Sequence, residues 1–243
     1  MIPLRDDIPS RTYPVVNILL IAANVMVFFY QLMLGPQLPV FVREFAVIPA
    51  RYFHNVIITP GGGLQEVTAS DVTIPLFTSM FLHGGWLHLI GNMLYLWIFG
   101  DNVEDRMGHG RYLLFYVLCG MTASAAHIWA NANSRVPSLG ASGAIAGVLS
   151  AYLLLYPRAR VVVLLPLWFF LHVTEVPALL FLGFWFVQQF FYGVLSLGIV
   201  SAQTGGVAWW AHIGGFIAGA VLVWIFARKR YRPATRDVWW RER

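Results

Sequence analysis

Charge is what this sequence has least of. Only 11% of its 243 residues are charged, whereas 58% are hydrophobic. A soluble globular domain carries about 25% charged residues, so this chain has too little charge to cover a surface that faces water. Intrinsic disorder is excluded as well, because disordered chains are poor in hydrophobic residues. The composition therefore predicts a membrane protein that crosses the bilayer several times.

Cysteine and lysine are almost missing too. The one cysteine, Cys119, lies in an apolar run, so no internal disulfide can form, and we interpret its thiol as a small buried hydrophobe. Lys229 is the one lysine beside fifteen arginines, and the net charge is +5. Seven of the sixteen basic residues lie within 228–243, directly after an apolar run. That placement is typical of a cytoplasmic anchor and not of a nucleic-acid-binding surface, so no nucleic-acid partner is expected.

Six apolar stretches are long enough, or nearly so, to cross a bilayer, which takes a helix of about 20 residues. These stretches are 14–35, 83–100, 111–130, 141–157, 177–198 and 207–227. We therefore expect an all-α fold, a bundle of six transmembrane helices with a long membrane-associated loop at 36–82. The apolar residues 161–173 are too few to span the bilayer, and we expect them in or near its interface.

The arginines predict the orientation of the chain. With six spans, thirteen of the sixteen basic residues lie on the side that carries both termini. The positive-inside rule then places both termini in the cytoplasm. We accordingly divide the chain into a cytoplasmic segment at 1–13, a membrane domain at 14–227 and a basic cytoplasmic tail at 228–243.

The first polar motif, Gly140-Ala141-Ser142-Gly143, begins the fourth apolar stretch. Polar residues inside spans are costly and therefore indicate function. A serine at a helix N-terminus has a free backbone N–H that can stabilise an oxyanion. The pattern of Gly143 and Gly147, four residues apart, equally fits close helix packing. Taken alone, this motif leaves catalysis and packing open.

The second motif is Ala211-His212, followed by Gly215 and Gly219, in the sixth stretch. Taken alone, His212 could be a base, a haem ligand or a hydrogen-bonded strut. At 1.5 Å per helical residue, Ser142 lies roughly 22 Å and His212 roughly 24 Å from the cytoplasmic ends of their stretches. Equal depth lets the two side chains meet, as nucleophilic catalysis requires.

The third motif places His88 and Asn92 four residues apart, and therefore on one face of the second predicted helix. Two donors on one face suit a developing oxyanion, and interhelical hydrogen bonding is the alternative. His83 lies off that face, and we expect it to be a structural hydrogen-bonding residue at the mouth of the helix.

Together these motifs resemble the rhomboid intramembrane serine proteases of the six-span bacterial type. Residues 100–108 also resemble the family's segment after the second span, and the similarity covers 12–227. The resemblance implies that Ser142 is the nucleophile and His212 the base, with no acidic third member. It implies an oxyanion hole of the Ser142 N–H, His88 and Asn92. Supporting structural roles are expected for His83, Gly140, Gly143, Gly215, Gly219, Glu104 and Arg106.

The resemblance also implies substrates that are transmembrane or membrane-anchored proteins, a location in the bacterial inner membrane, and no cofactor or metal. The sequence leaves the oligomeric state open. One position departs from the family. Some members carry an aromatic residue four positions after the serine, stacked on the histidine, and here that position is Ala146. Trp209 and Trp210 are candidates for orienting His212 instead. We interpret Gln188 and Gln189 in the fifth stretch as interhelical hydrogen-bonding residues.

Two other functions stay open at this point. A non-catalytic binder or chaperone could recognise transmembrane helices in the same groove. A haem or quinone protein could use His88, His127 and His212. A zinc protease is disfavoured because the sequence has no H-E-x-x-H motif.

Overall fold

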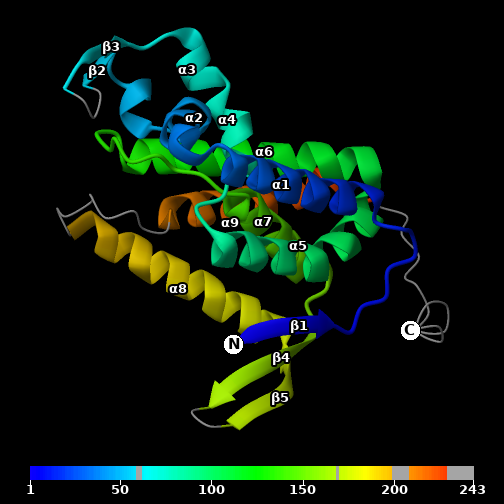
Figure 1. Ribbon diagram of the computed structural model, residues 1–243. Coiled ribbons are helices and arrows are strands. Elements are labelled where there is room, and N and C mark those ends of the chain that lie inside the picture. Colours follow the sequence, from blue (N-terminus) through cyan, green and yellow to red (C-terminus); the bar gives the residue numbers. More distant parts are fainter. Residues whose placement is uncertain (59–61, 168–169, 199–207, 229–243) are drawn as a thin grey trace.

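A computed structural model describes residues 1–58, 62–167, 170–198 and 208–228. In this part of the chain, each of the six apolar stretches forms a helix of 14 residues or more (Figure 1). The helices are α1 (Val15–Met33), α5 (Trp86–Met107), α6 (His109–Ala130), α7 (Ser142–Leu155), α8 (Ala178–Gly198) and α9 (Trp209–Phe226). Among the described residues, α1, α6, α8 and α9 are long and apolar enough to cross a membrane. Six spans therefore stay a prediction, because α7 is short and α5 is less apolar.

Large apolar side chains cover the outer faces of these helices. Water would penalise such a surface, whereas lipid tails are as apolar as the side chains themselves. The outer surface of the helical bundle is therefore suited to contact with lipid tails. Exposed examples are Leu19 and Met26 on α1, Phe184, Val187 and Phe191 on α8, and Val221 and Trp224 on α9.

Helix α7 lies at the centre of the bundle, and every residue from 143 to 152 is buried. Glycines allow α9 to approach it closely. A Cβ atom at Gly215 would overlap the carbonyl of Gly143, and one at Gly219 would overlap the carbonyl of Gly147. Two small-residue pairs at four-residue spacing thus bring the two backbones together. This contact sets the first turns of α7 and α9 side by side.

The first loop folds into short elements outside the helical bundle. These are η1 (Gly35–Gln37), α2 (Leu38–Phe45), η2 (Pro49–Tyr52), β2 (Val56–Ile58), β3 (Leu64–Glu66), α3 (Ala69–Thr73), α4 (Pro75–Thr78) and η3 (Ser79–Phe81). Its expected association with the membrane surface stays a prediction.

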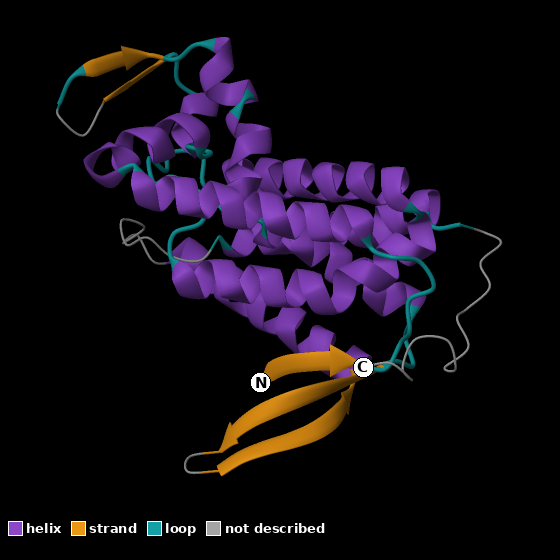
Figure 2. Cartoon of the chain, turned by 45° about the vertical axis from the view of Figure 1, so that its right-hand side comes forward, coloured by secondary structure: helices purple, strands orange, loops and turns teal. Residues whose placement is uncertain are grey.

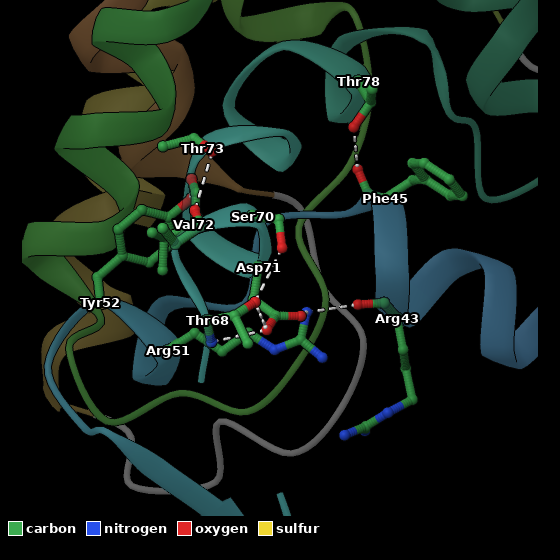
Figure 3. A network of polar contacts seen from close by, with 11 residues as sticks. Arg43, Phe45, Arg51, Tyr52, Thr68, Ser70, Asp71, Val72, Thr73 and Thr78 are labelled. Carbon is green, nitrogen blue, oxygen red and sulfur yellow. Dashed lines mark hydrogen bonds and ion pairs between the residues drawn. The ribbon is translucent and has the colours of Figure 1, made fainter. Parts of the chain in front are cut away.

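Polar contacts hold this loop together around the buried Arg51 (Figure 3). The Arg51 guanidinium donates to the Arg43 carbonyl at 2.7 Å and lies 4.0 Å from the Asp71 carboxylate. Thr68 caps α3 together with Asp71. The hydrogen bond from the Thr68 hydroxyl lowers the pKa of Asp71, and the charge of Arg51 adds to that effect. The Thr78 hydroxyl donates to the carbonyl of Phe45 at 2.8 Å and so joins α4 to α2.

Strands correct the expectation of an all-α fold. Strands β1 (Ile2–Asp6), β4 (Arg160–Leu167) and β5 (Phe170–Pro177) form an antiparallel sheet in the order β1-β4-β5 (Figure 2). Residues 161–173 thus lie mostly in a hairpin. A short apolar run cannot be assigned to helix or strand by periodicity alone, and the three successive valines at 161–163 favour a strand. The interfacial location of the hairpin stays a prediction.

Acidic residues at the end of α5 fasten the N-terminal segment to the bundle. The Glu104 carboxylate, fully buried, accepts the backbone N–H groups of Val16 at 3.0 Å and Asn17 at 2.7 Å. A carboxylate at a helix N-terminus satisfies free donors and the helix dipole together. The Arg106 carbonyl accepts the N–H of Arg228 at 3.1 Å.

Apart from Arg228, the basic tail expected at 228–243 lies outside the described residues. The division of the chain into 1–13, 14–227 and 228–243 stays a prediction.

Candidate active site

Ser142 is the first residue of α7, where backbone N–H groups have no partner inside the helix. The segment before it is held by the first loop. Val47 and Ser138 exchange two backbone hydrogen bonds, and the Gly140 N–H donates to the Ser79 carbonyl at 2.9 Å. Gly140 has a φ of +127°, which side chains disfavour, and a Cβ there would lie 2.7 Å from His88 Nε2. Glycine at 140 therefore permits the turn that presents Ser142.

His212 lies in the first turn of α9, opposite Ser142. Its Nε2 is 2.8 Å from the Ser142 Oγ, although 70 residues separate the two in sequence. The imidazole is buried, with 7% of the residue exposed. A serine hydroxyl hydrogen-bonded to a buried imidazole is the arrangement that activates a nucleophile through a general base. The equal depth inferred from the sequence corresponds to a direct contact in the structure.

The other ring nitrogen of His212 contacts a residue of a third helix. Nδ1 lies 2.6 Å from Gln189 Oε1 on α8. Trp185, also on α8, tilts against the imidazole at a centroid distance of 5.7 Å, and Trp209 meets it edge-on at 6.3 Å. Trp209 was a candidate from the sequence, whereas Trp185 was not. The signal for Gln189 was a polar side chain inside an apolar span, but nothing in the sequence distinguished it from Gln188.

The third motif lies on α5 and faces the same space. His88 and Asn92 line one cavity together with Ser142 and His212. His83 is buried just before the helix, and its Nε2 accepts a hydrogen bond from the Asn92 Nδ2 at 3.0 Å. Gln31 of α1 in turn holds the His83 backbone, accepting its N–H at 2.9 Å and donating to its carbonyl at 3.2 Å.

The cavity has a volume of about 1260 Å³. It is lined by polar groups from the three motifs and by aromatic side chains, including Trp185, Trp209 and Trp210. His127 of α6 also lines it. Non-helical backbone at membrane depth is tolerated where it lines a water-filled space, and the segment before Ser142 does line this cavity.

Comparison with known proteins places these residues in one family. The Rhomboid domain matches residues 71–229, well over half of the chain, and this range contains Ser142, His212, His88 and Asn92. The chain belongs to the rhomboid family. The resemblance stated from the motifs is thereby confirmed at family level, and this rhomboid is an integral membrane protein with at least four apolar helices of spanning length in its described part.

The relatives of this rhomboid come from a yeast, a plant and a bacterium. It is 29% identical over 161 residues to "Rhomboid protein 1, mitochondrial" of Saccharomyces cerevisiae. The matched region covers 64% of this chain and 42% of the relative. It is 29% identical over 167 residues to "Rhomboid-like protein 11, chloroplastic" of Arabidopsis thaliana, covering 66% of this chain and 55% of that protein. Over 78 residues, 32% of this chain and 15% of the relative, it is 47% identical to "Rhomboid protease GluP" of Bacillus subtilis. The chain thus spans about half or less of the length of these relatives.

Two of the expected supporting residues of this rhomboid lie far from the cavity. Glu104 follows His88 by 16 residues on the same helix, a distance of roughly 24 Å along its axis. Glu104 and Arg106 contact the N-terminal segment and Arg228 instead, as described above. Glu104 makes its contacts through the side chain, whereas Arg106 accepts the N–H of Arg228 through its backbone carbonyl. The structural roles expected for these two residues stay predictions.

Proposed function

We propose that this rhomboid is an intramembrane serine endopeptidase that cleaves transmembrane or membrane-anchored proteins. The observation that carries the proposal is the 2.8 Å hydrogen bond between Ser142 Oγ and His212 Nε2, which opens onto the cavity. The partial likeness to a relative named as a rhomboid protease supports it. A binder of transmembrane helices would have no need of a serine paired with a base.

The first half of the reaction uses the pair directly. His212 Nε2 takes the hydroxyl proton as Ser142 Oγ attacks the carbonyl carbon of the scissile bond. The carbonyl oxygen becomes an oxyanion. In our proposal three groups donate hydrogen bonds to that oxygen: the backbone N–H of Ser142, the imidazole of His88 and the side-chain amide of Asn92. All three residues line the cavity, which supports this role. His212 then gives its proton to the leaving amine, which leaves an acyl ester on Ser142.

The second half repeats the chemistry with water. A water molecule in the cavity gives a proton to His212 and attacks the ester, and the acid product departs as Ser142 regains its proton. The depth of the serine explains why a cavity is needed. The hydrocarbon core holds no water for hydrolysis, so water must reach Ser142 through a polar space enclosed by protein.

We also propose that α5 and α7 complete six spans, with both termini in the cytoplasm of a bacterium and the chain in its inner membrane. The charge distribution supports this orientation, because thirteen of the sixteen basic residues then face the cytoplasm. In this arrangement the cavity opens toward the outer face. The first loop lies on that face as well, where its apolar side chains are placed to contact the membrane surface.

The proposal is tested with purified protein in liposomes and a co-reconstituted single-span substrate. We expect Ser142→Ala and His212→Ala each to abolish cleavage, because the nucleophile and its base act as a unit. A fluorophosphonate probe, which reacts with activated serines, should label the wild type and not Ser142→Ala.

Matched controls are Ser150→Ala and His54→Ala. Ser150 is buried on the same helix α7 but donates only to the Gly147 carbonyl, and His54 is exposed in the first loop. Both controls should cleave at close to the wild-type rate. Cleavage that persists in either Ser142→Ala or His212→Ala would overturn the proposal, as would a wild type that binds the substrate and never cuts it.

A further inference from the structure

We propose that Gln189 is the positioning residue of this site, and that it fixes which nitrogen of His212 carries the proton. The inference rests on the proposed function and extends it from a serine–histidine pair to three hydrogen-bonded residues, Ser142, His212 and Gln189. The three side chains come from α7, α9 and α8, so three helices converge on a single chain of hydrogen bonds.

The geometry leaves one arrangement that can work. Gln189 Oε1 lies 2.6 Å from His212 Nδ1, and Ser142 Oγ lies 2.8 Å from His212 Nε2. A neutral imidazole has one N–H and one lone pair. With the proton on Nδ1, the ring donates to the amide oxygen of Gln189, and the lone pair on Nε2 faces the hydroxyl that it must deprotonate.

Removing the acceptor would reverse this arrangement. A buried N–H without a partner is costly, so an Nδ1–H facing an apolar side chain would be disfavoured. The ring proton would move to Nε2 and be donated to Ser142 Oγ. His212 would then have no lone pair toward the serine, and the hydroxyl would not be activated. Gln189 therefore acts on the reaction through the tautomer of His212.

Burial and charge explain why a neutral amide suits this position. Gln189 is 6% exposed and His212 is 7% exposed, so water does not compete for the hydrogen bond. A charged carboxylate in a membrane span is costly, whereas an amide oxygen accepts the same N–H without a formal charge. The contact also gives His212 an orienting partner in a chain that has Ala146 where some family members have an aromatic residue, because a methyl group cannot stack on the imidazole.

The neighbouring glutamine is a matched control within the same helix. Gln188 has the same side chain one position earlier on α8, but it is exposed on the outer face of the bundle. Gln188→Leu and Gln189→Leu thus make the same chemical change in two environments. Gln189→Glu is the rescue variant, because a glutamate offers Nδ1–H an acceptor oxygen whether or not it is ionised.

The experiment combines a spectroscopic and a chemical measurement on the full chain in detergent micelles. Protein with 15N-labelled histidine reports the ring nitrogen shifts of His212, assigned by their loss in His212→Ala. The labelling rate of Ser142 with a fluorophosphonate reports the reactivity of the serine. We expect Gln189→Leu to move the proton to Nε2 and to slow labelling on the order of 100-fold. Gln189→Glu should keep the Nδ1–H tautomer and most of the rate, and Gln188→Leu should match the wild type.

The two readouts separate this inference from the proposed function. If Gln189→Leu keeps the Nδ1–H tautomer, or labels as fast as the wild type, Gln189 does not position His212 and the inference is wrong. If the wild type shows the Nδ1–H tautomer, Gln189→Leu loses it, and neither protein reacts or cleaves, the tautomer assignment is supported while the proposed protease function fails. A Gln188→Leu variant that loses the tautomer would show a general effect of α8 and would overturn the specific role of Gln189.

Discussion

At the scale of single residues, Asn92 combines a structural contact with a proposed catalytic one. Its amide nitrogen lies 3.0 Å from His83 Nε2, and an amide has two N–H groups, so a second donor remains for the cavity. We expect Asn92→Ala to lower kcat by about 100-fold, because one oxyanion donor is lost, with KM little changed. Steady-state cleavage in liposomes measures both constants. The control variant is Asn131→Ala, at another asparagine that lines the cavity, and its kcat should stay close to that of the wild type. An equal loss of kcat in both variants would contradict the oxyanion role of Asn92.

At the scale of elements, the contact between α7 and α9 depends on missing side chains. A Cβ at Gly215 would overlap the backbone of Gly143, whereas a Cβ at Gly183 on α8 would meet nothing within 4 Å. We expect Gly215→Ala to lower the free energy of unfolding by roughly 1–3 kcal/mol, because the helices are forced apart, and to slow the labelling of Ser142. Gly183→Ala should leave stability equal or raise it by up to about 1 kcal/mol. Thermal unfolding in detergent checks both, and equal melting temperatures would refute the close-packing explanation.

At the scale of the whole molecule, the N-terminal strand is tied to the centre of the bundle through Asp6. The Tyr152 hydroxyl of α7 donates to this carboxyl. Burial raises the pKa of Asp6 from 3.8 to about 8, and the nearby Asp101 and Asp7 add to the rise. The folded state thus holds the proton more tightly than the unfolded state, so this contribution to stability is complete below about pH 4 and is lost as the pH rises through 8.

Asp6→Asn removes this titration while keeping an oxygen that accepts from Tyr152. We expect the wild-type melting temperature in detergent to fall between pH 5 and pH 9 by more than that of Asp6→Asn. The difference between the two proteins isolates Asp6 from the other titrating groups. Parallel curves for the two proteins would show that Asp6 does not carry the effect.

What the sequence determined by itself is what depends on local chemistry. Low charge and long apolar runs decided the membrane class, because the need to satisfy backbone hydrogen bonds in lipid acts on each segment separately. The apolar runs located five of the six helices to within two residues at each end, whereas α5 begins three residues and ends seven residues beyond the predicted stretch 83–100. The motifs at Ser142, His212 and His88 were visible for the same reason, since polar groups stand out in apolar spans. The hairpin at 160–177 was not visible, because a short apolar run fits helix and strand alike.

Only the tertiary structure decided which polar groups meet. Gln188 and Gln189 are identical in sequence terms, and the rotation of α8 alone buries one against His212 and exposes the other. Likewise, Trp185 contacts the imidazole more closely than Trp209, although Trp209 is much nearer to it along the chain. The physical reason is that contacts between helices depend on how each helix is rotated and how closely it approaches its neighbours. Here, glycines on α7 and α9, and no property of Ser142 or His212 themselves, set that approach.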